Sequence, residues 1–386
     1  MTEFGDGKLF FARSYKMLKM FRFKFILPAG LLVLFVMQNS FAAGSNSRPL
    51  VAPELLKHAK LKILWENELP IKNNESLDRL LLLDNRLYAI SNRNYLIHLN
   101  KKNGEIIFGK AIAQAGFPIA EFQPYGDELL SVDGSRLIQI DAQTGTERKQ
   151  MDAGFRISCP AARNSTYIYL AGIDNRLHVY RDKDRVMKFE VAAENDSLIT
   201  SILAEENSVI FGTAAGNIIS FMPDTPQRLW QFDASKAIAG PIVKDGMSLF
   251  FASKDTNVYR VDIVGLPEKK RLVWKHQTAA VLDKAPRVTQ GIVYQPVRGK
   301  GLIAIDKATG ALLWSVPGGI DLLTEAGNKA YVITNTGTLV VMDNVKAKRL
   351  YSANFADVSK HVSNITDDII YIADNRGRIA CLQPVE

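Results

Sequence analysis

The side chains best suited to chemistry in this sequence are its histidines and aspartates, and their spacing limits what they can do. The five histidines are His58, His98, His178, His276 and His361. No two of them stand at the short spacing that metal ligands take on one strand or helical turn. Four aspartates recur at the ends of apolar segments, where they favour capping of turns over calcium binding: Asp141, Asp262, Asp306 and Asp343. The sequence also lacks a nucleophile elbow and a Gly-rich phosphate loop, so we expect no catalytic residue, metal or cofactor.

The two cysteines, Cys159 and Cys381, are far apart in the sequence. They fall in the third and the eighth copy of a strand–turn–strand repeat, and a disulfide needs Cα atoms within about 7 Å. We therefore expect two free, largely buried thiols, although export would permit a disulfide.

This strand–turn–strand pattern recurs eight times and must position all of these residues. Its second strands begin at intervals of 37 to 44 residues. They cover residues 96–100, 137–141, 177–181, 218–222, 258–262, 302–306, 339–343 and 379–383. A period near forty residues with four strands per unit is typical of a β-propeller. The sequence thus predicts an all-β, eight-bladed propeller of four-stranded antiparallel blades over residues 61–386.

The ring is expected to close through its N-terminal strand. Residues 61–66, which contain Trp65, resemble the outer strand of later repeats, whereas residues 360–383 supply only three strands. An N-terminal outer strand would complete the last blade and remove free sheet edges.

The first 42 residues are predicted to form an export signal. Basic residues precede an apolar run over residues 25–37, and small residues follow at 40–43. The true start is either Met1, Met17 or Met20, and an uncleaved anchor is the alternative to cleavage. Residues 43–60 are expected to form an N-terminal tail with at most one helical turn, and no lipid-anchor cysteine is seen near the expected cleavage site.

The formal net charge is +8, of which residues 1–42 contribute +4 through six Lys or Arg and two Asp or Glu. The remaining excess is spread along the chain, and no clustered basic face is evident. We therefore expect no nucleic-acid partner.

One copy of the repeat carries a family resemblance. Residues 301–314 contain Asp306, Thr309, Gly310 and Trp314, and this spacing resembles the pyrroloquinoline-quinone-like repeat. Residues 141–145 match its first half. Two branches carry this repeat: quinoprotein dehydrogenases, which use adjacent cysteines, and the non-enzymatic BamB branch, which serves outer-membrane β-barrel assembly. Length, export signal and repeat number are similar to the BamB branch, and the adjacent cysteines of the enzymes are missing.

The resemblance implies a periplasmic scaffold, a monomer within a complex, held at the outer membrane by a BamA-like partner. It also implies two docking loops. The first contains Leu282 and Asp283, where Asp283 matches the second of two family acids and Val281 replaces the first. The second contains Asp196 but lacks the family's arginine. A docking acid implies a basic partner. The alternatives are a scaffold of another cell-envelope complex and a quinone-dependent enzyme.

Loop aromatics are further candidates for contacts with a peptide. Phe117, Phe122, Tyr125 and Phe155 lie between the first three repeats. They could line the mouth of the central funnel and hold an unfolded outer-membrane protein strand. The simpler alternative is that they pack between blades, as aromatic residues do in propellers.

Overall fold

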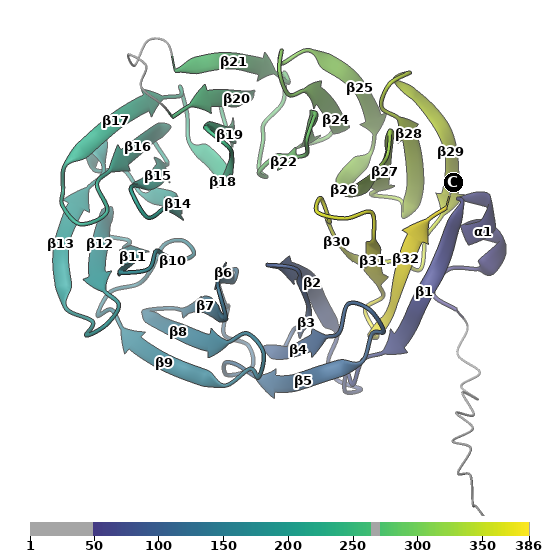
Figure 1. Ribbon diagram of the computed structural model, residues 1–386, viewed down its shortest axis with the longest axis horizontal. Coiled ribbons are helices and arrows are strands. Elements are labelled where there is room, and N and C mark those ends of the chain that lie inside the picture. Colours follow the sequence, from purple (N-terminus) through teal and green to yellow (C-terminus); the bar gives the residue numbers. More distant parts are fainter. Residues whose placement is uncertain (1–48, 264–270, 386) are drawn as a thin grey trace, which may run out of the picture. The chain divides into compact units, whose positions relative to one another are not determined.

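The computed structural model describes residues 49–263 and 271–385. Eight four-stranded antiparallel sheets follow one another around a ring, as Figure 1 shows. The predicted all-β, eight-bladed propeller is therefore confirmed. The expected export signal lies outside the described residues. Within those two ranges, no helix combines the length and the apolar content that crossing a bilayer requires.

Blades 1 to 7 each take four consecutive strands, which run in order from the innermost to the outermost. Blade 1 consists of β2 (Leu77–Leu83), β3 (Arg86–Ser91), β4 (Tyr95–Leu99) and β5 (Ile106–Ala111). Blade 2 consists of β6 (Gln123–Tyr125), β7 (Glu128–Asp133), β8 (Arg136–Asp141) and β9 (Glu147–Asp152). Blade 3 consists of β10 (Ala162–Arg163), β11 (Tyr167–Ala171), β12 (Arg176–Arg181) and β13 (Met187–Ala192). Blade 4 consists of β14 (Ile199–Ala204), β15 (Val209–Thr213), β16 (Asn217–Phe221) and β17 (Arg228–Asp233).

The second half of the ring continues the same order. Blade 5 consists of β18 (Ile238–Asp245), β19 (Ser248–Ser253), β20 (Asn257–Asp262) and β21 (Leu272–Gln277). Blade 6 consists of β22 (Arg287–Val288), β23 (Ile292–Val297), β24 (Gly301–Asp306) and β25 (Leu312–Pro317). Blade 7 consists of β26 (Gly319–Ala326), β27 (Lys329–Thr334), β28 (Thr338–Asp343) and β29 (Lys348–Asn354). Blade 8 consists of β30 (Lys360–Val362), β31 (Ile370–Ala373), β32 (Arg378–Pro384) and β1 (Leu61–Glu68).

This order gives the ring two different faces. Consecutive strands are antiparallel, so the segments that join them alternate between the two ends of a blade. The loops from an outer strand to the next inner strand and the turns between the second and third strands share one face, which we call the loop face. The other two turns of each blade lie on the opposite face.

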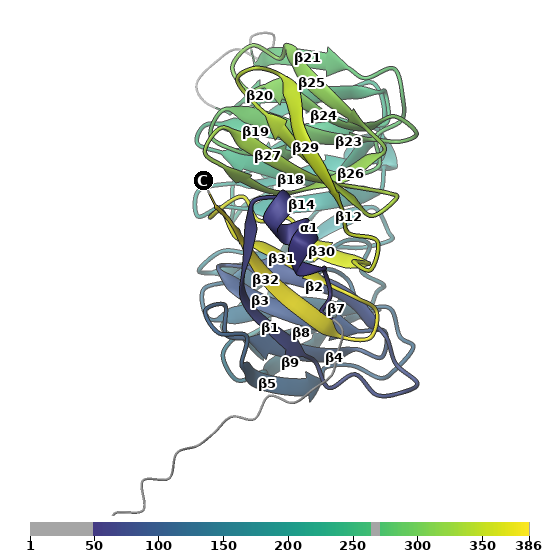
Figure 2. The same cartoon turned by 90° about the vertical axis from the view of Figure 1, so that its right-hand side faces the viewer.

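Blade 8 closes the ring as predicted, because β1 pairs with β32 from Leu61 opposite Pro384 to Glu68 opposite Arg378. The preceding helix α1 (Pro53–His58) packs against β1 and β29, as Figure 2 shows. Leu56 of this helix is 3% exposed and joins the core beneath blades 7 and 8. The N-terminal segment thus reinforces the closing blade.

Tryptophans on the outer strands of blades 8 and 5 lock each of these blades onto the next one. Trp65 of β1 covers Gly104 in blade 1, and its indole Nε1 donates to the carbonyl of Lys101 at 2.8 Å. Trp274 of β21 covers Gly310 in blade 6 in the same way, with its Nε1 3.0 Å from the Lys307 carbonyl oxygen. Both indoles therefore pack between neighbouring blades.

The Asp and Thr of the repeat cap the turn that the indole covers. Asp306 Oδ1 accepts hydrogen bonds from Thr309 N and from Thr309 Oγ1, both at 2.7 Å. These bonds hold the pKa of the Asp306 carboxyl below its usual value. Gly310 then takes a φ of +76°, which only glycine adopts without strain. The aspartate therefore builds the turn, as predicted.

Gly310→Ala is expected to destabilise the protein more than Gly299→Ala. Both glycines have left-handed φ, so both substitutions carry a backbone cost of about 1–2 kcal/mol. An added Cβ at Gly310 would also lie 2.8 Å from the Trp274 ring, whereas nothing lies within 4 Å of one at Gly299. Urea denaturation of the two variants measures the difference. Equal urea midpoints for the two variants would show that the Trp274 ring can accommodate a Cβ at position 310.

Candidate docking face

The loop over residues 278–286 joins blades 5 and 6 on the loop face, and internal contacts hold it in place. Leu282 is fully buried between the two blades. Thr278 Oγ1 donates to the carbonyl of Thr256 at 2.9 Å. The side-chain amide of Gln295 donates to the carbonyl of Lys284 at 3.0 Å. Leu282 is therefore an anchor of the loop and presents no surface to a partner.

Asp283 follows this anchor and is accessible. Its side chain is 46% exposed, and its Oδ2 lies 3.6 Å from Arg298 Nη1, whose side chain is 77% exposed. An ion pair this exposed contributes little to stability. The two charges are thus available to a ligand, and the anchored backbone fixes where Asp283 stands.

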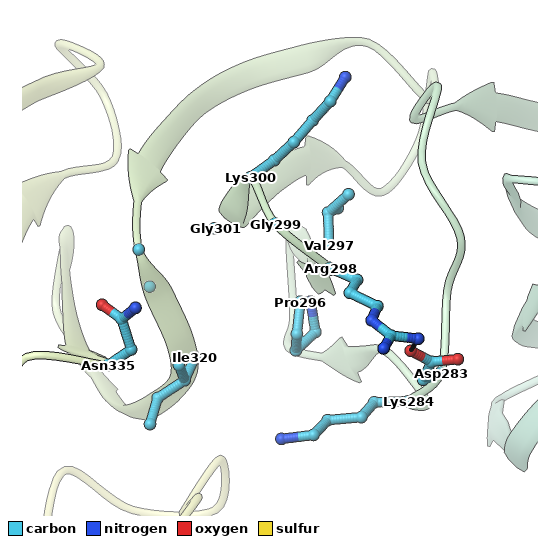
Figure 3. A pocket seen from close by; sticks show the side chains of 12 residues that line it. Asp283, Lys284, Pro296, Val297, Arg298, Gly299, Lys300, Gly301, Ile320 and Asn335 are labelled. Atoms are coloured by element: carbon cyan, nitrogen blue, oxygen red, sulfur yellow. Dashed lines mark ion pairs between the residues drawn. The ribbon is translucent and has the colours of Figure 1, made fainter.

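A cavity of about 310 Å³ opens beside this ion pair, between blades 6 and 7. Figure 3 shows Asp283 and Lys284 on one side of it and Ile320 and Asn335 on the other. The turn that carries Arg298 lies between them. Among the described residues, the Lys284 ammonium has neither a hydrogen bond nor an ion pair. Sequence reasoning missed Lys284, Arg298 and Asn335, because these residues belong to separate segments that meet around the cavity only in the folded ring.

Asp196 lies on the same face but elsewhere on the ring. It ends the short 3₁₀ turn Glu194–Asp196 between β13 and β14, and it is exposed. Its backbone carbonyl accepts a hydrogen bond from Asn175 Nδ2 at 2.8 Å. Asp196 precedes blade 4, whereas Asp283 precedes blade 6, and the cavity lining does not include Asp196. The structure does not bring the two predicted docking acids together.

The four aromatic candidates have different surroundings. Phe122 is 3% exposed in the core between blades 1 and 2, so the packing alternative describes it. Phe155 stacks on His178 with ring centroids 4.0 Å apart, and Tyr125 lies under the guanidinium of Arg163. Phe117 is 51% exposed.

A separate cavity of about 430 Å³ is lined by inner-strand residues of blades 1, 2, 4 and 5 and by the loop segments over residues 119–121 and 157–160. Its lining includes Ile119 and Gln123 but none of the four aromatic candidates. The four aromatic candidates therefore do not line this cavity.

The histidines of the blades make internal contacts. His178 Nε2 lies 2.9 Å from Asp174 Oδ2. His98 is 4% exposed and stacks on Tyr88, and burial lowers its pKa. The Nδ1 atom of His98 has no hydrogen-bond partner among the described residues. Over residues 49–263 and 271–385, no group of three His, Cys, Asp or Glu side chains could hold a metal ion.

Both cysteines are free and buried, as predicted. Burial raises the pKa of the Cys159 thiol to about 12, and it raises the pKa of the Cys381 thiol to about 12. Because the thiolate is the reactive form, we expect neither thiol of the folded protein to react with a disulfide reagent near pH 8. Both should react at once in denaturant. Rapid labelling of the native protein would contradict the buried positions.

Comparisons with known proteins agree with this fold. Residues 254–386 match the family described as outer membrane protein assembly factor BamB. BamB from Moraxella catarrhalis is similar in structure, with a TM-score of 0.62 and 15% identity over 84% of this chain and 97% of that one. The computationally designed Ika8 protein has a TM-score of 0.64 and 15% identity over 83% of this chain and 99% of that one. No curated protein sequence matches the chain.

These findings support the BamB-like resemblance that the repeat indicated. The two solved structures show the fold alone, because only 15% of their residues are identical. The family match covers the C-terminal third of the chain, and the loop over residues 278–286 and the cavity beside it lie within it.

Proposed function

We propose that the chain, whose C-terminal third matches the BamB-like proteins of the pyrroloquinoline-quinone-like repeat family, is a non-enzymatic docking scaffold of the cell envelope. Its rigid loop face binds a periplasmic partner that takes part in outer-membrane β-barrel assembly, a subunit similar to BamA. The observation that carries the proposal is the anchored loop over residues 278–286, which lies inside the matched region.

The loop has the properties of a docking element. Leu282 fills the space between blades 5 and 6, so the backbone of Asp283 is fixed before a partner arrives. A preorganised loop loses little conformational entropy on binding. The exposed Val281 and Asp283 flank the anchor and supply an apolar and a charged contact. Binding energy at such surfaces is concentrated in a few residues.

A photo-crosslinking residue introduced in place of Asp283 tests this function in the envelope of intact cells. We expect one dominant adduct with an outer-membrane assembly subunit, identified by mass spectrometry. The matched control carries the same residue in place of Lys183, which is exposed on the opposite face. Equal adducts from both positions, or no adduct from position 283, would contradict docking through this face.

A scaffold of another envelope complex is the second candidate. The family's first docking acid is replaced in this chain by Val281, which is 43% exposed, and the second loop has no arginine. Both changes alter the chemistry of the surface offered to a partner. An adduct at position 283 with a subunit outside the β-barrel assembly machinery would favour this candidate.

A further inference from the structure

We propose that the cavity beside Asp283 binds an acidic side chain of an extended partner segment, through Lys284 and Arg298. In this arrangement Asp283 orients Arg298 and does not itself bind a basic partner. The inference rests on the proposed docking function and names the chemistry of the segment that docks.

The charge of the loop face around the cavity supports this assignment. The segments of this face in blades 5 and 6 cover residues 234–237, 254–256, 278–286 and 298–300, all of them described. They carry five cations and two carboxylates, so their net charge is +3. The cations are Lys236, Lys254, Lys284, Arg298 and Lys300, and the carboxylates are Asp255 and Asp283. A surface of this sign attracts acidic segments and repels basic ones.

Both carboxylates of this region already have partners. Asp255 accepts a hydrogen bond from the Tyr259 hydroxyl at 2.7 Å, which helps to hold its pKa down against burial. Asp283 faces Arg298 at 3.6 Å. A basic ligand at Asp283 would therefore have to compete with Arg298 and approach Lys284. An acidic ligand competes with Asp283 for Arg298, but it has the ammonium of Lys284 to itself.

The cavity lining offers donors for a carboxylate. Lys284 points into the region beside Ile320, away from Asp283, as Figure 3 shows. Its ammonium has no partner among the described residues, and Asn335 stands across the cavity with an amide that can donate. Gly318 and Gly319 also belong to the lining and contribute no side chain to it. Its volume of about 310 Å³ admits one or two side chains of an extended segment.

Selection of a random 12-residue peptide library on the immobilised full chain tests the proposal. We expect the selected peptides to be enriched in Asp and Glu. The best of them, synthesised with an acetylated N-terminus and an amidated C-terminus, is then measured by fluorescence anisotropy, together with its Glu→Gln counterpart. The blocked ends ensure that a side chain, and not a terminal carboxylate, is tested.

Three variants complete the experiment. Lys284→Ser/Arg298→Ser is expected to bind the acidic peptide about five- to ten-fold more weakly, as two accessible charge contacts would predict. Asp283→Asn releases Arg298 and should bind it about two-fold more tightly. The control, Lys183→Ser/Lys346→Ser, removes two exposed cations from the opposite face and should bind as the unaltered chain does. Melting curves should be unchanged in all three.

Selection of basic peptides by the unaltered chain, with loss of that selection in Asp283→Asn, would overturn the proposal in favour of a basic partner. Selected peptides without a charge bias, or equal binding by the Lys284→Ser/Arg298→Ser variant, would overturn it as well. The outcome is separable from that of the crosslinking experiment. Selection of acidic peptides without an adduct at position 283 would support the acidic ligand and contradict the docking function. An adduct at position 283 without selection of acidic peptides would support the docking function and contradict the acidic ligand.

Discussion

Trp65→Ala is expected to lower the free energy of unfolding by about 3–5 kcal/mol, the range found when buried tryptophans are truncated to alanine. The indole is 7% exposed, packs on Gly104 and donates to the Lys101 carbonyl at 2.8 Å. Its loss creates a cavity at the junction between blades 8 and 1 and leaves that carbonyl without its donor. Urea denaturation followed by circular dichroism measures the effect.

Leu64→Ala is the matched control, because Leu64 is the neighbour of Trp65 on β1 and is 43% exposed. We expect a cost below about 1 kcal/mol for it, as for most exposed positions. Similar costs for both variants would mean that the indole does not lock the ring.

Deletion of residues 61–66 extends the test from one side chain to the strand. These residues form most of β1, and their removal leaves β32 as an unpaired edge. An exposed edge strand invites pairing with other chains. We expect the deleted chain to lose cooperative melting or to aggregate. A melting temperature within a degree or two of the unaltered chain would show that the ring does not depend on closure by β1.

The sequence predicted the fold well because a repeat constrains each blade several times over. The Asp306, Thr309 and Gly310 turn, its covering tryptophan and the alternating strands are all local patterns, and each recurs around the ring. The closing strand could be predicted because residues 61–66, which contain Trp65, have the pattern of an outer strand. In the other repeats three inner strands precede this pattern, whereas none precedes it here.

The candidate site was less predictable, because its residues come from different segments. The family resemblance identified Asp283. The burial of Leu282 depends on the space between two blades, which the spacing of residues in the sequence does not reveal. Lys284, Arg298 and Asn335 carry no motif and meet only through the geometry of blades 6 and 7. A clustered basic patch was not evident in the sequence for the same reason, since the five cations of the loop face in blades 5 and 6 lie in four separate segments.

A chain of charged side chains along the inner strands was likewise invisible in the sequence. Arg287 of β22 donates from Nε and Nη2 to the two carboxylate oxygens of Asp321 on β26, at 3.2 and 3.0 Å. His361 of β30 lies 3.7 Å from the same carboxylate. Three successive blades are thus joined at the channel wall. Burial opposes ionisation of Asp321, but His361 and Arg287 outweigh it and hold the pKa of this carboxyl far below its usual value.

Arg287→Met is therefore expected to cost about 2–3 kcal/mol near pH 7. Breaking a buried ion pair costs about 3–5 kcal/mol because one charge stays buried without its partner, and we reduce this figure because Arg287 is 42% exposed. The double variant Arg287→Met/Asp321→Leu removes the stranded carboxylate as well. It should recover most of the loss, since an apolar pair of similar volume is often neutral.

The pH dependence separates this account from a loss of packing. The folded-state pKa of Asp321 lies below its unfolded value near 3.9, so the stabilisation that Arg287 provides is present above that value and disappears as the pH falls toward the folded pKa. Urea denaturation at about pH 7 and about pH 2 should therefore show a deficit for Arg287→Met that narrows at the lower pH, which lies below the unfolded-state pKa. A deficit of the same size at both pH values, or one that persists in the double variant, would mean that the methylenes of Arg287, and not its charge, join the blades.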